Sequence, residues 1–235
     1  MERGALALHS PLVLDRKMSD GVREAIDRQA FNRALAEIWT VVRAANRAAN
    51  PEGHNAPVAS FGGLDARLLI VGLAPGLKGA NRTARPFTGD YAGDLLYETL
   101  CKTGFASGGY DKRADDGLIL EDCRITNAVK CLPPDNKPVG AEINTCNAYL
   151  AHALRLLTND SRMLALGGID HRAVIRAMCL RQADYPFSHA AEHEVAPGIM
   201  LLDSYHCSRY NTQTGRLTRS MFLDVVKTAG NIANP

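Results

Sequence analysis

Short apolar segments that alternate with helical patterns constrain the fold of this chain more than any other feature. Each has the length and continuous apolar character of a strand buried on both faces of a sheet. The segments span residues 68–73, 123–129, 163–166 and 199–202. Because strands that alternate with helices build parallel sheets covered on both faces, we predict an α/β fold. Its expected form is a three-layer α/β/α sandwich around a mainly parallel, four-stranded sheet.

The remaining segments are consistent with one domain over residues 1–235, of which the first 20 are expected to be loosely ordered. No internal repeat and no long linker divides the chain. Loops are expected at residues 46–63 and 108–117, which are rich in Gly and polar residues. Gly104 and Gly230 are expected to end two of the helices. Apolar spacing predicts helices over residues 31–45, 94–101, 141–157, 173–180 and 217–228.

Composition limits the kinds of partner that the chain can have. Of its 235 residues 46% are hydrophobic, which is enough to bury a core without disulfides or metals. The net charge is only +2, so any surface for nucleic acid must be a local basic patch. No apolar run approaches the ~18 residues of a membrane-spanning helix, and the first residues do not resemble a signal peptide. We expect a soluble, cytoplasmic protein that contacts no membrane.

The first apolar strand leads into a turn of small residues, Gly72-Leu73-Ala74-Pro75-Gly76. Such a turn lets the backbone approach a ligand closely, although doubly wound proteins often have one without an unusual ligand. Cations, an aromatic ring and a carboxylate follow it in the order Lys78, Arg82, Arg85, Phe87 and Asp90. This set suits a flat, uncharged ring attached to a polyanion, such as a base in DNA. The segment lacks the sequence of a nucleoside-triphosphate loop and the GxGxxG spacing of dinucleotide sites.

Residues that follow the parallel strands are expected to meet at one edge of the sheet. The first strand brings Phe87 and Asp90, the second brings Asn127, and the fourth brings His206. Each has a simpler explanation. Phe87 fits a core position, Asp90 a helix N-cap, Asn127 a loop anchor and His206 the surface. The case for a site therefore rests on their joint placement.

Three long motifs give the chain a family resemblance. They comprise GLAPG, GANRT and RPFTGD within residues 72–90, NAVKC and PPDNKP within 127–138, and HCSRYNTQTGRLT at 206–218. In this order they resemble the uracil-DNA glycosylase superfamily over roughly residues 60–228. The most similar branch is family five, or type B, which is related to the iron–sulfur enzymes of family four.

The resemblance implies a DNA-repair enzyme that flips uracil out of DNA and hydrolyses its N-glycosidic bond. Phe87 would stack on the base, and Asn127 would read its Watson–Crick edge. His206 would hydrogen-bond uracil O2, and Asp90 would hold the attacking water and face the cationic sugar. The backbone of the turn would help to bind the base through Gly72, Leu73, Ala74, Pro75 and Gly76.

The implied partner is DNA that contains uracil or a related deaminated base, bound by a monomer. Arg209 or Tyr210 is the candidate wedge that fills the vacated space in the duplex. Basic and loop residues are expected to contact the DNA, namely Lys78, Arg82, Arg85, Lys137, Ser208, Arg209, Tyr210, Asn211 and Arg216.

The cysteines depart from the family pattern. Relatives hold an iron–sulfur cluster with four cysteines, of which Cys131 and Cys146 match two, and residues 1–100 contain none. We therefore predict no cluster, no other metal and no cofactor, with the predicted helix over residues 31–45 supplying apolar packing instead. Cys207 replaces the usual proline after the histidine, which leaves that loop freer. A thiol nucleophile at Cys207 is a weaker interpretation, because adjacent side chains rarely face each other.

Two other functions are also compatible with the sequence. One is a binding module for uracil, abasic sites or single strands without turnover, against which the presence of both Asp90 and His206 argues. The other is a hydrolase of small nucleosides, against which the basic residues argue. A steep loss of affinity with salt would separate both DNA-binding hypotheses from the nucleoside hydrolase.

Overall fold

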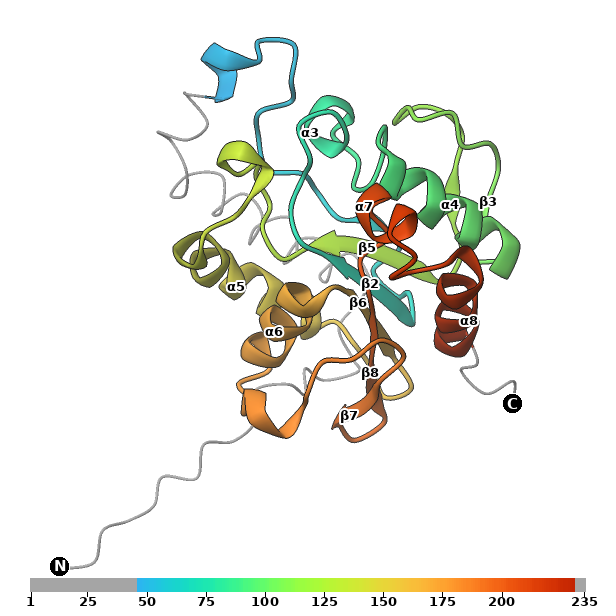
Figure 1. Ribbon diagram of the computed structural model, residues 1–235. Coiled ribbons are helices and arrows are strands. Elements are labelled where there is room, and N and C mark those ends of the chain that lie inside the picture. Colours follow the sequence, from blue (N-terminus) through green and yellow to red (C-terminus); the bar gives the residue numbers. More distant parts are fainter. Residues whose placement is uncertain (1–45, 231–235) are drawn as a thin grey trace, which may run out of the picture.

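The structure is a computed structural model that describes residues 46–230 (Figure 1). Its main sheet has six strands in the order β1-β5-β2-β6-β8-β7. The central four are parallel and match the four predicted strands: β5 (Cys123–Asn127), β2 (Leu68–Gly72), β6 (Arg162–Leu166) and β8 (Ile199–Ser204). Their apolar side chains are almost all fully buried, as a sheet covered on both faces requires.

The sheet is wider than the predicted four strands because antiparallel strands flank both edges. β1 (Phe61–Gly62) pairs with β5, and β7 (Glu192–Ala196) pairs with β8. Neither is a continuous apolar run, since β1 has two residues and β7 is largely polar and partly exposed. A separate two-stranded sheet joins β3 (Ala106–Ser107) to β4 (Ile119–Leu120).

Helices cover both faces of the main sheet and confirm the predicted three-layer sandwich. On one face α4 (Tyr91–Thr103) packs against α8 (Arg219–Gly230), and on the other α5 (Gly140–Leu154) packs against α6 (Gly168–Ala177) (Figure 1). Alternate residues of β2 pack into the two cores, one on each face of the sheet. Leu68 and Ile70 belong to the core under α4 and α8, whereas Leu69 and Val71 belong to the core under α5 and α6.

The helix boundaries differ from the predicted ones where capping decides them. α4 begins at Tyr91 because Asp90 is its N-cap, and it ends at Thr103. Gly104 is the expected C-cap and has a left-handed φ of 80°. α6 begins at Gly168, earlier than the apolar pattern indicated. The predicted helix over residues 31–45 and the loosely ordered start lie outside the described residues. Residues 46–49 are helical where a loop was expected. Four further short helices were not predicted: α3 (Ala80–Thr83), η1 (Pro134–Asn136), η2 (Gln182–Asp184) and α7 (Arg209–Gln213).

The parallel strands end together at the edge that carries the motifs. Gly72 lies opposite Asn127 in the register of β2 and β5. Two further backbone hydrogen bonds, Ala128 N to Gly72 O and Val129 N to Leu73 O, each 2.8 Å, hold the segments together beyond the strands.

Within the described residues, no helix is long and apolar enough to span a membrane.

Candidate active site

A cavity of about 260 Å³ opens where β2, β5 and β8 end. Phe87, Asp90, Asn127 and His206 all line it, together with most of the small-residue turn. Its full lining is Leu73, Ala74, Pro75, Gly76, Ala80, Phe87, Asp90, Ala92, Asn127, Asn136 and His206. The structure thus brings together the residues that the sequence placed at separate strand ends. Of the predicted base-binding residues, Gly72 alone is not part of the wall.

Gly72 makes room for the aromatic wall of the cavity. A Cβ atom at this position would lie 2.5 Å from two ring carbons of Phe87 and 2.8 Å from Asn127 Oδ1. Phe87 itself has a left-handed φ of 51°, which a residue with a side chain adopts only when its surroundings enforce it. The Phe87 ring therefore occupies space that is available only because residue 72 has no side chain.

Gly72→Ala is expected to lower kcat/KM for the uracil release that the family resemblance implies by roughly tenfold or more, because the new methyl group must displace the Phe87 ring or the Asn127 amide. Steady-state kinetics on a uracil-containing oligonucleotide, with thermal melting alongside, measures the effect. Gly140→Ala is the matched control, since a Cβ there meets nothing within 4 Å. Equal kinetics for both variants would show that the Phe87 ring position does not matter.

Asp90 uses its two carboxylate oxygens differently. Oδ1 accepts a hydrogen bond of 3.0 Å from Gly93 N and caps α4. Oδ2 faces the turn, where a Cβ on Gly79 would come within 2.2 Å of it and a Cβ on Gly76 within 3.3 Å. The N-cap role that the sequence left open is therefore observed, and the carboxylate still lines the cavity.

His206 is held in place through its backbone. The Asn211 amide donates from Nδ2 to His206 O over 2.9 Å, and Ser208 caps α7 by accepting from Asn211 N. The His206 ring centroid lies 6.2 Å from that of Phe87, with 30° between the ring planes. Burial lowers the pKa of His206, and the negative charge of Asp90 opposes this in part. A neutral imidazole at neutral pH is thus available as a hydrogen-bond donor.

The His206 imidazole is expected to titrate below pH 6.5, because burial in the folded protein disfavours its charged form. Asp90→Asn is expected to lower that midpoint further, since it removes the one carboxylate that raises the pKa of His206. NMR titration of the histidine side chains measures both values, with His206→Gln to assign the signal. A midpoint that does not move in Asp90→Asn would contradict the shared electrostatics of the two side chains.

Cys207 does not line the cavity. Its side chain is fully buried in the core under α4 and α8, and Sγ donates to Ala92 O over 3.4 Å. Burial raises the pKa of the thiol, which opposes thiolate formation. The structure therefore argues against the thiol-nucleophile interpretation, and Asn211 and Ser208 brace the loop in place of the usual proline.

Most of the predicted DNA-contacting residues lie at the surface around the cavity. Tyr210 is 72% exposed, the highest value among the exposed large hydrophobic residues described. Arg209 lies over the Tyr91 ring at 5.2 Å, and Arg216 lies over the Tyr205 ring at 4.5 Å. Ser208 and Asn211 are half-buried and brace the His206 loop. The exposed members of the set are Lys78, Arg82, Lys137, Arg209, Tyr210 and Arg216.

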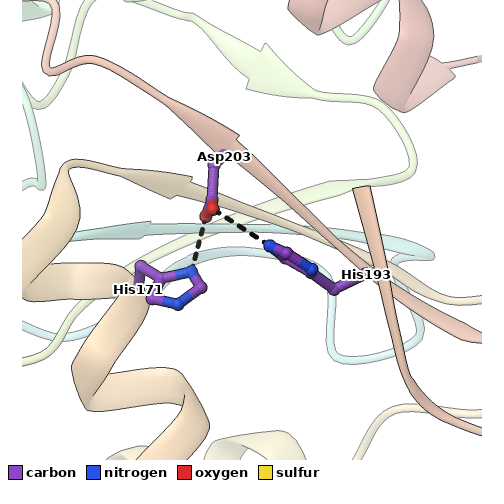
Figure 2. Close-up of side chains that lie close together, drawn as sticks. All are labelled: His171, His193 and Asp203. Carbon is purple, nitrogen blue, oxygen red and sulfur yellow. Dashed lines mark hydrogen bonds and ion pairs between the residues drawn. The ribbon is translucent and has the colours of Figure 1, made fainter. Parts of the chain in front are cut away.

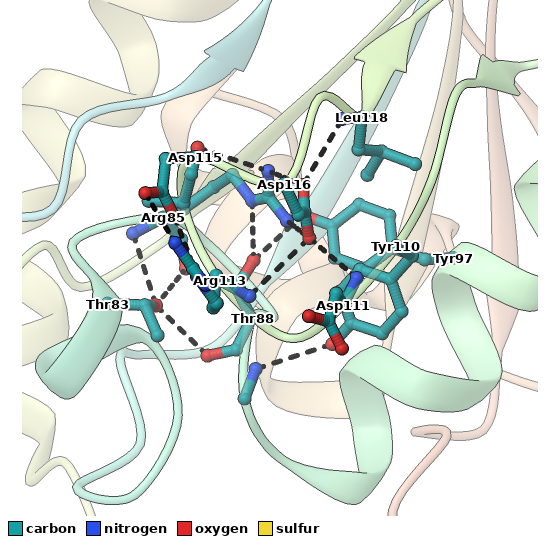
Figure 3. Close-up of polar contacts among 12 residues, drawn as sticks. Thr83, Arg85, Thr88, Tyr97, Tyr110, Asp111, Arg113, Asp115, Asp116 and Leu118 are labelled. Atoms are coloured by element: carbon teal, nitrogen blue, oxygen red, sulfur yellow. Dashed lines mark hydrogen bonds and ion pairs between the residues drawn. The ribbon is translucent and has the colours of Figure 1, made fainter.

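Arg85 does not fit the predicted contact with DNA, because its guanidinium is buried in an ion pair (Figure 3). Nη1 and Nη2 bind the two oxygens of Asp116 at 2.8 and 2.9 Å, and the side chains are 5% and 1% exposed. Nε donates to Thr88 Oγ1 over 2.8 Å. The guanidinium also lies 5.0 Å from the centre of the Phe61 ring. Arg85 thus ties the segment before Phe87 to the polar loop at residues 108–117.

Three cavity residues were not predicted, namely Ala80, Ala92 and Asn136. Asn136 belongs to the PPDNKP segment and has a left-handed φ of 57°. Its Oδ1 accepts from Leu77 N over 2.7 Å, which joins this segment to the turn after β2. A polar segment rich in Pro and Asn is the sequence feature that could have indicated it.

The cysteine positions do not fit the four-cysteine cluster of the family resemblance. All six cysteines lie between residues 101 and 207, within the described part of the chain. Cys131 and Cys146, which match two ligands, are both buried. Among the described residues, the one group of three or more His, Cys, Asp or Glu side chains with ligand spacing contains no cysteine.

Comparison with known proteins shows the family of the chain. Residues 59–229 match the family model of the uracil DNA glycosylase superfamily. The chain is 45% identical to a type-5 uracil-DNA glycosylase of Thermus thermophilus, over 75% of this chain and 80% of that protein. It is 42% identical to one of Mycobacterium leprae, over 75% and 78%. A type-4 enzyme of Pyrobaculum aerophilum matches at 37% over 47% of this chain and 49% of its own length. The chain therefore belongs to the uracil-DNA glycosylase superfamily, on the side of its type-5 members.

Proposed function

We propose that this protein is a DNA-repair glycosylase that hydrolyses the bond between uracil and deoxyribose in DNA and leaves an abasic site. The observation that carries the proposal is the shared cavity of Phe87, Asp90, Asn127 and His206. A cavity of about 260 Å³ suits one base, and it is slightly below the ~300–1,000 Å³ of typical small-molecule pockets. The type-5 names of the relatives support the same activity.

Recognition begins when uracil leaves the base stack and enters the cavity. The Phe87 ring stacks on the flat base, and the Asn127 amide offers both a donor and an acceptor to its polar edge. Asn127 is buried at the end of β5, so that an unmatched base edge would leave buried polar groups without partners. This cost is the physical basis of base selection.

Hydrolysis then breaks the bond between sugar C1′ and uracil N1, and the bonding electrons go to the base. Negative charge gathers on uracil O2, where an N–H of neutral His206 donates a hydrogen bond. Asp90 faces the cationic sugar and orients a water molecule, whose oxygen forms the new bond to C1′. The proton of that water passes to the carboxylate. Each preorganised hydrogen bond to developing charge contributes roughly 3–4 kcal/mol by analogy with oxyanion holes.

The surface around the cavity suits a DNA strand. Exposed Lys78, Arg82, Lys137 and Arg216 supply phosphate contacts, and Tyr210 or Arg209 enters the space that the base leaves. We expect the chain to act as one glycosylase domain, over residues 1–235, and as a cytoplasmic monomer. The mechanism uses side chains and water. The expectation that the chain carries no iron–sulfur cluster rests on the sequence, because residues 1–100 contain no cysteine.

Alkali-dependent strand cleavage tests the proposal. Labelled oligonucleotides with one uracil, or with thymine at the same place, are incubated with the protein and then treated with alkali. Cleavage at uracil and not at thymine is the expected result. Tight retention of the uracil oligonucleotide without cleavage would instead favour the binding module.

A further inference from the structure

A second cluster of chemistry-bearing side chains lies away from the cavity lining. It consists of His171 on α6, His193 on β7 and Asp203 on β8, which converge as Figure 2 shows. One ligand atom from each lies within 4.8 Å of those of the other two. None of the three lines the uracil cavity, and the proposed glycosylase mechanism uses none of them.

The hydrogen bonds of His171 fix the direction in which its ring presents a lone pair. Nε2 lies 2.8 Å from Tyr185 O, and because a carbonyl oxygen only accepts, Nε2 carries the hydrogen. In the neutral ring Nδ1 is then an acceptor, yet it lies 2.8 Å from Asp203 Oδ1. Two acceptors at this distance need a cation between them, either a proton or a metal ion.

His193 completes the set on the other side of Asp203. Its Nε2 lies 3.5 Å from Asp203 Oδ2. Neither atom has a hydrogen-bond partner among the described residues, although both are buried and Asp203 is 0% exposed. An uncompensated buried carboxylate oxygen beside an uncompensated imidazole nitrogen is costly, and one shared cation would satisfy both.

We propose that His171 Nδ1, His193 Nε2 and the Asp203 carboxylate bind a divalent transition-metal ion, best matched by Zn²⁺. Imidazole and carboxylate are ligands that zinc accepts, and three protein ligands leave one position for water. Bond lengths of ~2.0–2.2 Å in a tetrahedral site place neighbouring ligand atoms roughly 3.4 Å apart. The observed separations of 2.8 and 3.5 Å bracket this value, so small shifts suffice. The Tyr185 carbonyl already provides the outer hydrogen bond that commonly orients a ligating histidine.

The ion is expected to stabilise the fold because its ligands join three elements. The ion would fasten α6 and the edge strand β7 to β8, the strand that leads into the His206 segment. An ion that binds only the folded chain raises its stability according to its free concentration.

Metal analysis of the full-length, tag-free protein tests the site. The protein is stripped with EDTA, incubated with zinc and then separated from unbound zinc. It is expected to retain about one zinc per chain and to melt at a higher temperature than the stripped protein. His193→Gln and Asp203→Asn are each expected to bind zinc roughly tenfold or more weakly. His54→Gln, on an exposed loop, is the matched control and is expected to behave as wild type.

Either of two results would overturn the proposal. If wild type neither retains zinc nor changes its melting temperature, the cation between His171 and Asp203 is a proton. If the site variants retain as much zinc as wild type, the ion is bound elsewhere. Cobalt(II) added to wild type needs no variant to fold. A tetrahedral d–d spectrum without a thiolate charge-transfer band is expected, whereas that band would assign the ion to cysteines.

Discussion

Asp90→Ser is expected to lower the single-turnover rate of uracil release by about 10²- to 10⁴-fold, the usual contribution of a positioned general base. The carboxylate has one oxygen directed at the turn beside the cavity, where water and the cationic sugar would lie. Serine removes this charge but preserves the N-cap of α4, because its hydroxyl also accepts from the N–H of Gly93. A slower release of uracil by this variant can therefore be distinguished from a loss of stability at the start of α4.

The comparison needs a carboxylate that does not face the cavity. Asp94 lies in the first turn of the same helix and pairs with Lys112 over 2.8 Å at the surface. Asp94→Asn removes a similar favourable charge from the helix N-terminus and is expected to keep nearly the full rate. Rapid-quench measurement with excess protein gives both rates, and binding to uracil DNA is expected to persist. A full rate for Asp90→Ser would mean that another group positions the water.

Asp116→Ala is expected to destabilise the fold by about 3–5 kcal/mol, because it leaves the Arg85 charge buried without its partner. Burial alone would raise the pKa of Asp116, but hydrogen bonds from Arg85 and from the backbone outweigh it and hold that pKa below its usual range. The lowered pKa means that the pair stabilises the fold above about pH 4, and this contribution is lost as the pH falls further.

Urea unfolding at pH 7 measures the loss, with Asp115→Ala as control. Asp115 is the preceding residue, and its ion pair with Arg113 is exposed to solvent. Removing that pair is therefore expected to change the free energy of unfolding little. Replacing both buried partners, as Arg85→Met with Asp116→Leu, is expected to cost less than the sum of the single changes. Equal effects of Asp116→Ala and Asp115→Ala would show that Arg85 is solvated in solution.

The parts of the fold and of the site that depend on local sequence pattern could be predicted. The central strands are continuous apolar runs, and Asp90, Asn127 and His206 lie at or beyond strand ends, so the fold class and these three cavity residues could both be predicted. β7 could not, since its residues are mostly polar and it pairs only at an edge.

Contacts between segments that are distant in the sequence could not be predicted from the sequence pattern. Arg85 has the appearance of a surface cation, but its partner Asp116 lies 31 residues away in a polar loop. His171 and Asp203 come from different elements, 32 residues apart, and no short motif links them. Such pairs depend on how the elements pack, and only the assembled fold reveals them.

Direct detection of the released base tests the central claim. Excess wild-type protein is incubated with an oligonucleotide that contains one uracil, and free uracil is measured by mass spectrometry beside the number of alkali-labile sites. The account predicts that both rise together to one per oligonucleotide, and that Asp90→Ser reaches the same endpoint far more slowly. Bound DNA without free uracil would contradict the assignment of this cavity as a glycosylase active site.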